Sequence, residues 1–199
     1  TSIATVTISV TGVNDAPTLT SVNTLTGAIE DAAFVITHTM LASAANEADV
    51  DNLGLSFRLE SVSSGTLTKN GTPVVPGSTL GSGESVVWTP AANANGALDA
   101  FMIKAWDGSL ASSGAVQVKA SVMPVNDAPS FAKGGNQTVL EDTSAQTVAG
   151  WATAISAGPS DESGQTLTFQ VSNDNSTLFS AQPALAANGT LTYTPAANG

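Results

Sequence analysis

Two identical five-residue stretches, Val13-Asn14-Asp15-Ala16-Pro17 and Val125-Asn126-Asp127-Ala128-Pro129, decide how this chain is organised. They lie 112 positions apart (125 minus 13), and each follows a run of alternating small and β-branched residues. A Glu-Asp pair comes 12 or 13 residues after each proline, as Glu30-Asp31 and Glu141-Asp142. A repeat of this length is the size of one globular domain rather than of a solenoid unit. The two stretches are therefore predicted to be linkers between consecutive domains.

The register of the repeat divides the 199 residues into three parts. Residues 1–13 are predicted to be the last strand of a preceding repeat, because Val6, Ile8 and Val10 alternate with polar residues as the positions 112 residues later do. Residues 14–125 are predicted to form one complete repeat. Residues 126–199 are predicted to form a second, truncated repeat that lacks its last two strands and therefore has an open edge.

Short runs of alternating apolar and polar residues fill both repeats, which is the pattern of half-buried antiparallel strands. Between two such runs, Asn70-Gly71 predicts a hairpin with a two-residue turn. About seven short strands separated by turns are typical of an immunoglobulin-like β-sandwich. The predicted fold class is all-β, with tandem immunoglobulin-like sandwiches of which the C-terminal one is incomplete. Strands are predicted over residues 5–11, 18–28, 34–40, 53–59, 66–69, 72–74, 84–89, 100–106, 114–123 and 165–171.

Composition and charge exclude several classes of function. The net charge is −11 and the five Lys and Arg are scattered, so no basic stripe is available for a nucleic acid or an anionic membrane. No apolar run is long enough for membrane insertion. The chain has no Cys, and its single histidine, His38, is predicted to face the core from a strand. Disulfides, thiolate metal sites and a His-based catalytic triad are therefore not expected, and the segment is predicted not to be an enzyme.

The acidic residues gather at turns, where they suggest oxygen-based metal chemistry. Asn14 and Asp15 stand in the entering linker, Asp49 and Asp51 in one loop, and Asp107 in another. In a sandwich entered from one end these loops return to that end, and Ca²⁺ is the cation that best tolerates irregular loops of oxygen ligands. The alternative is that these acids are solvated turn residues. A second set of ligands is predicted at the opposite end and the junction, comprising Glu30, Asp99, Asn126, Asp127, Asp161 and Glu162.

The linkers, the glutamate that follows each, Asp49-Val50-Asp51 and Asp107-Gly108 resemble cadherin-like tandem repeats. The phrases Trp88–Asn93 and Tyr193–Asn198 resemble repeats of large secreted bacterial surface proteins of the adhesin and biofilm type. The resemblance implies an extracellular, Ca²⁺-stiffened structural repeat that supports cell adhesion. The partners it implies are neighbouring repeats of the same chain.

Two alternative functions remain open from the sequence. In the first, the chain is an extracellular structural subunit that forms filaments by strand complementation, so that residues 4–10 of one copy complete the second repeat of another. In the second, the chain is a spacer in a secreted polysaccharide-active enzyme.

Overall fold

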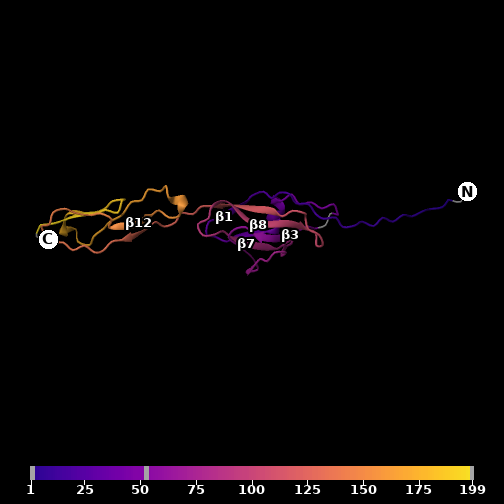
Figure 1. Cartoon of the computed structure of the whole chain (residues 1–199), viewed down its shortest axis with the longest axis horizontal. Coiled ribbons are helices and arrows are strands. Elements are labelled where there is room, and N and C mark those ends of the chain that lie inside the picture. Colours follow the sequence, from indigo (N-terminus) through magenta and orange to yellow (C-terminus); the bar gives the residue numbers. More distant parts are fainter. Residues whose placement is uncertain (1–2, 52–53, 198–199) are drawn as a thin grey trace. The chain divides into compact units, whose positions relative to one another are not determined.

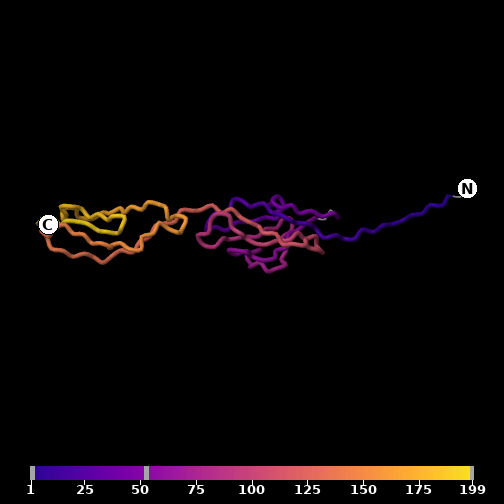
Figure 2. Tube along the Cα trace, turned by 45° about the horizontal axis from the view of Figure 1, so that its top comes forward, coloured from indigo at the N-terminus to yellow at the C-terminus, as the bar shows by residue number. Residues whose placement is uncertain are grey.

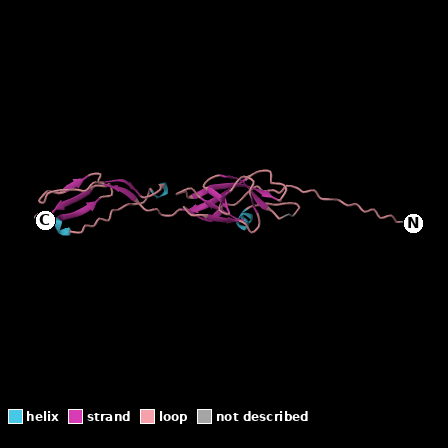
Figure 3. Ribbon diagram, turned by 90° about the horizontal axis from the view of Figure 1, so that it is seen from below, coloured by secondary structure: helices cyan, strands magenta, loops and turns pink. Residues whose placement is uncertain are grey.

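In a computed structural model, which describes residues 3–51 and 54–197, the chain divides into two compact units, Thr1–Val125 and Asn126–Gly199. The division falls at the second linker. Strands dominate both units and the helices are short (Figure 3). The predicted all-β fold is therefore confirmed. Within the described residues, no helix is long and apolar enough to cross a membrane.

Unit 1 is a sandwich of two sheets around one hydrophobic core. One sheet has the strand order β1-β9-β8-β3-β6 and the other the order β2-β7-β4-β5, and β7 lies in a different layer from β1, β8 and β3 (Figure 1). The core draws Phe57 and Phe101 from the first sheet and Ile36 and Trp88 from the second, all fully buried. The strands are β1 (Leu25–Ile29), β2 (Phe34–Thr37), β3 (Ser56–Val62), β4 (Thr66–Lys69), β5 (Thr72–Pro73), β6 (Thr79–Leu80), β7 (Ser85–Thr89), β8 (Gly96–Trp106) and β9 (Val116–Met123).

The apolar alternation read from the sequence sets the strand register in unit 1. Strand β9 pairs antiparallel with β8 and parallel with β1, and its residues Val118, Ala120 and Val122 are buried. The predicted hairpin joins β4 to β5, with both Asn70 and Gly71 at positive φ (52° and 77°). These are the dihedral angles that a two-residue turn between twisted strands requires.

The predicted strand over residues 34–40 is wrong in its second half. Strand β2 ends at Thr37, and helix α1 (His38–Ala44) begins at once. The Thr37 hydroxyl accepts a hydrogen bond from the Met40 N–H over 3.1 Å, so this threonine caps the helix that the strand pattern concealed. His38 therefore lies on a helix, where its ring packs 5.4 Å from Phe57 and its Nε2 hydrogen bonds to the Leu55 carbonyl.

Three other predicted strands differ from the structure. Residues 5–11 and 165–171 are extended but belong to no strand in the described part of the chain, and the former appear as an unpaired trace (Figure 2). An extended segment becomes a strand only where a neighbour accepts its backbone hydrogen bonds. Of residues 18–28, only Leu25–Ala28 fall in β1, and Thr18 and Val22 form isolated bridges to Ala48 and Ala45. Leu53, in the predicted strand 53–59, lies outside the described residues.

Unit 2 has two small sheets, ordered β10-β12 and β11-β14-β13. Among its described residues the buried apolar side chains are few: Ala152, Ala157 and Tyr193. Phe131 and Phe169 meet edge to face, with ring centroids 5.1 Å apart. The elements are β10 (Ser130–Lys133), β11 (Gln146–Val148), β12 (Ala152–Ser156), β13 (Phe179–Leu185), β14 (Leu191–Pro195) and the single turns η1 (Ser160–Glu162) and η2 (Ser176–Leu178).

Candidate functional site

The linker that enters unit 1 is hydrogen-bonded to two loops. Asn14 Nδ2 donates to Oδ2 of Asp107 over 2.9 Å, and the Asp15 N–H donates to Oδ2 of Asp51 over 2.7 Å. The Asp51 N–H in turn donates to Oδ1 of Asp49 over 2.7 Å. The five residues predicted for this end of the sandwich are therefore held by two sets of hydrogen bonds that start from adjacent linker residues, and we call these five residues the linker cluster.

The fold places these loops side by side because of strand pairing. Ser56 at the start of β3 is paired with Trp106 at the end of β8, so the loop before β3 and the loop after β8 leave the sheet together. The Asn46 side chain fixes the first loop to the residues that follow the linker: its Oδ1 accepts from the N–H groups of Thr20 and Ser21, over 3.0 and 2.9 Å. The loop that carries Asp49 and Asp51 is therefore positioned by the strand pair β3–β8 and by the hydrogen bonds of Asn46 to the backbone after the linker.

The carboxylates in and beside the linker cluster differ in electrostatic environment. The Leu110 N–H, followed by the Asn14 amide, lowers the pKa of Asp107, which favours the anionic form of this carboxyl group. Burial raises the pKa of Glu47, against the smaller effects of its own backbone N–H and of His38. Oε2 of Glu47 and Oδ2 of Asp49 are buried and have no hydrogen-bond partner. A buried carboxylate oxygen without a partner is costly, and a cation is one way to satisfy it.

Glu47 is a residue that sequence reasoning missed. It stands two positions before Asp49, so that Glu47, Asp49 and Asp51 alternate along one loop. That spacing was available in the sequence as a signal. In residues 3–51 and 54–197, however, no three Asp, Glu or His side chains form a ready-made metal cage. The donor set fits Ca²⁺ in chemistry, because Ca²⁺ also accepts amide, backbone and water oxygens.

Glu30 and Asp99, predicted at the opposite end of unit 1, lie in different environments. Glu30 is buried (3% exposed), and both of its oxygens are engaged: Oε2 accepts from the Val125 N–H over 2.9 Å and Oε1 from Asn95 Nδ2 over 3.1 Å. Asp99 is half-exposed on β8, where it forms an ion pair with Lys119 on β9 at 2.9 Å. The structure does not bring these two residues together in any hydrogen bond or ion pair that the described residues make.

The entry to unit 2 repeats one contact of the linker cluster with a different acid. The Asp127 N–H donates to Oε1 of Glu162 over 2.6 Å, as Asp15 donates to Asp51 in unit 1. Glu162 is buried (5% exposed), its Oε2 has no hydrogen-bond partner, and the backbone of Gly158 packs against that oxygen. The Asn126 side chain accepts from Gln165 over 3.0 Å, whereas Asp161 is exposed on η1.

Unit 1 is therefore a β-sandwich whose entering linker is hydrogen-bonded to two loops that carry acidic residues. The chain belongs to the cadherin-like domain family, whose model matches residues 13–122, more than half of the chain. No curated protein sequence matches the chain significantly. Cadherin-like domains are typically extracellular, non-catalytic structural or adhesion modules, and they generally bind Ca²⁺.

Proposed function

We propose that unit 1 is a Ca²⁺-stiffened extender repeat of a large extracellular adhesin or surface protein of bacterial type. The observation that carries the proposal is the linker cluster, in which the entering linker is bonded to two acidic loops that include an unpartnered buried carboxylate oxygen. The residues that would hold the ion are Asn14, Asp15, Asp49, Asp51 and Asp107, and we add Glu47 to them.

Charge balance supports a bound cation. The ion pairs of the described residues join Arg58 to Glu60, Lys69 to Glu84 and Lys119 to Asp99, and none of them reaches the linker cluster. The acids of the cluster therefore repel one another with no basic residue in contact to offset the repulsion. A divalent cation supplies the missing positive charge when bound, and it attracts linker and loops at once.

The mechanical consequence concerns the freedom of the linker. The contacts of the cluster are single hydrogen bonds at exposed positions, where water competes for the same donors and acceptors. An ion shared by the linker and both loops would restrain Asn14 and Asp15 far more strongly. Extracellular modules bind Ca²⁺ with Kd of roughly 10⁻⁴–10⁻³ M. At a hundredfold excess over Kd, one site adds about 2.7 kcal/mol to stability.

Calcium titration of the full chain tests the proposal. Calorimetric Kd and thermal midpoint are measured with Ca²⁺, with Mg²⁺ and with chelator, for the wild type, Asp49→Asn and Asp174→Asn. Asp174 is an exposed acid of unit 2 outside the cluster and serves as the matched control. We expect Ca²⁺ to raise the midpoint of the wild type and of the control, and Asp49→Asn to weaken binding by tenfold or more. A wild type that releases no heat and melts identically with Ca²⁺ and with chelator would reject the proposal.

A further inference from the structure

Three Asn-Gly pairs stand in the described part of the chain, and they differ in how firmly the asparagine and the glycine are held. An asparagine followed by glycine is the pair in which the next backbone nitrogen most easily reaches the side-chain amide carbon, because glycine has no Cβ to hinder the approach. In a folded chain the reaction also requires that both groups are exposed and free to move. The three pairs are Asn70-Gly71, Asn95-Gly96 and Asn188-Gly189, and a fourth, Asn198-Gly199, lies outside the described residues.

The first pair is exposed and unrestrained. Asn70 and Gly71 form the two-residue turn between β4 and β5, and both are exposed. Among the described residues, no hydrogen bond engages the Asn70 side chain or the Gly71 N–H, and the space around Gly71 is open. Strand β5 is an edge strand that is paired only with β4. The turn can therefore change its conformation without disturbing the core of unit 1.

The second pair is held by its side chain and by its strand. Asn95 Nδ2 donates to Oε1 of the buried Glu30 over 3.1 Å. Gly96 is the first residue of β8 and is paired with Val122 of β9. Attack of the Gly96 nitrogen on the Asn95 amide carbon would have to release the side chain from Glu30 and distort the end of the strand.

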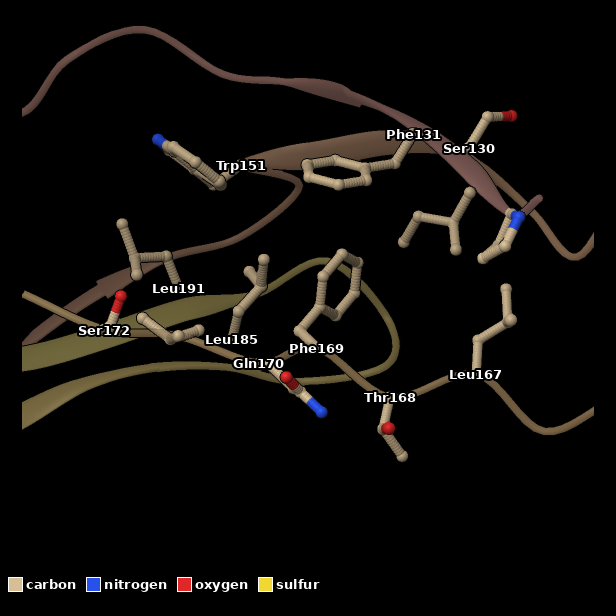
Figure 4. Close-up of a pocket in the computed structure, with 13 residues that line it drawn as sticks. Ser130, Phe131, Trp151, Leu167, Thr168, Phe169, Gln170, Ser172, Leu185 and Leu191 are labelled. Carbon is tan, nitrogen blue, oxygen red and sulfur yellow. The ribbon is translucent and has the colours of Figure 1, made fainter.

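The third pair is held by its backbone. The Gly189 N–H, which would be the nucleophile, donates to the Ala186 carbonyl over 2.8 Å. Oδ1 of Asn188 accepts from the Thr190 N–H over 3.1 Å. Gly189 is buried, and the strands on either side of this turn, β13 and β14, each contribute a leucine to the wall of a cavity in unit 2 (Figure 4). Reaction here requires at least these two hydrogen bonds to break first.

We propose that Asn70 is a site at which the folded chain modifies itself by deamidation through a cyclic imide. The Gly71 nitrogen gives up its proton and forms a bond to Cγ of Asn70. The bond from Cγ to Nδ2 breaks, the leaving nitrogen takes up the proton, and ammonia departs. Water then opens the succinimide ring at either of its carbonyl carbons, which gives aspartate or isoaspartate. The whole change consumes one water and releases one ammonia, and it needs no oxidant or reductant.

The modification changes the charge and the geometry of the hairpin. Either product adds one negative charge to a chain whose net charge is −11. In isoaspartate the main chain runs through the side-chain carbons, so the turn gains one backbone atom. The length of a hairpin turn fixes the register of its strands, so the pairing of Lys69 with Thr72 is lost in this product. Asn70 is not a residue of the linker cluster, and the inference goes beyond the proposed extender role.

Peptide mapping by mass spectrometry tests the inference on the full chain, which is kept at mildly alkaline pH and sampled over time. Two hydrogen bonds of ordinary strength correspond to roughly thirtyfold in rate, so Asn70 should convert faster than Asn188 by about that factor in the folded chain. In denaturant the described Asn-Gly pairs should convert at similar rates, because the fold no longer distinguishes them. Isoaspartate should appear at position 70, and heavy oxygen should be incorporated there when the water is labelled.

Two variants assign the reaction to its site. Asn70→Gly removes the amide and keeps a residue that readily adopts the positive φ of this turn, so the hairpin should persist. It should abolish the fast phase of ammonia release, whereas Asn188→Gly, the matched control in the other hairpin, should leave that phase unchanged. An Asn70 that converts no faster than Asn188 in the folded chain, or that keeps the same lead in denaturant, overturns the proposal. Fast ammonia release that survives Asn70→Gly overturns it too.

Discussion

Replacement of Glu30 by glutamine should destabilise unit 1 and release Val125, the first residue of the second linker. In the wild type, the two carboxylate oxygens accept from the Val125 N–H and from Asn95 Nδ2. A glutamine amide has only one oxygen, so one of these donors must face an NH₂ group. Leaving one buried donor unpaired costs about 1–3 kcal/mol. For a domain of this size, each kcal/mol is about 4 °C, so the expected fall in Tm is about 4–12 °C.

Calorimetric melting and amide hydrogen exchange measure this effect on the full chain in chelator. The Val125 amide should exchange faster in Glu30→Gln than in the wild type. Glu141→Gln is the control, because Glu141 is the corresponding residue of unit 2 and is exposed. Unchanged melting and unchanged Val125 exchange would refute the reasoning. A variant that matches the wild type in chelator but has lost stabilisation by Ca²⁺ would show instead that Glu30 is a metal ligand.

Three further predictions concern unit 1. Trp88→Phe should lower stability by about 2–4 kcal/mol in chemical denaturation, because it leaves a cavity in the core and removes the indole N–H that Ser64 O accepts at 2.8 Å; a loss no larger than that of Trp106→Phe, at a half-buried position, would contradict this. The Gly81 N–H, and then Lys69, lower the pKa of Glu84, so its ionised form stabilises the fold above the unfolded-state pKa, and this stabilisation is lost as pH falls through the lowered value. Melting curves of wild type and Glu84→Gln should accordingly differ at neutral pH and converge in acid, and a constant difference would be evidence against the contact. Glu47→Gln at neutral pH should raise Tm in chelator, because it removes a buried charge, and should reduce the gain from Ca²⁺; a lower Tm in chelator would mean that the carboxylate has a partner.

The sequence predicts the fold wherever a strand contains its own alternation and finds its partners within the same repeat. Strands β7 and β9 fall where alternation places them, and Asn70-Gly71 forms the expected turn. Strand β3 (Ser56–Val62) only overlaps the predicted residues 53–59, and β8 (Gly96–Trp106) begins before the predicted residues 100–106. Alternation alone could not show that residues 38–40 are helical, because the strand ends where the Thr37 side chain caps the first turn of α1. Nor could it tell that residues 165–171 form no strand in the described part of the chain, since pairing depends on residues outside the segment itself.

The part of the candidate site that could be predicted from the sequence is the meeting of the linker with the two loops, because the order of the strands determines it. Loops that leave adjacent strands on the same side must meet, and this brings Asp107 to the linker that also contacts Asp51. The burial of Glu47 depends on packing that no spacing reveals. The ion pair of Asp99 with Lys119 is a cross-strand contact, and predicting it requires the register of β8 against β9.

The two linkers share a hydrogen bond from the linker aspartate N–H to an acidic side chain, although that acidic residue is not at the same position in the two repeats. With the register of 112, Asp161 corresponds to Asp49, and a serine stands where unit 1 has Asp51. The N–H of the linker aspartate is nevertheless accepted by an acid in both units, by Asp51 in the first and by Glu162 in the second. Glu162 stands one position earlier in the register, and its side chain is longer by one methylene, which lets the carboxylate span the extra distance. A glycine at 158 leaves room for the displaced carboxylate, because a Cβ there would collide with it. The linker is therefore hydrogen-bonded to an acidic loop in both units, although the acid differs between them. This is expected if the fold requires a particular linker geometry and does not require one particular acidic residue.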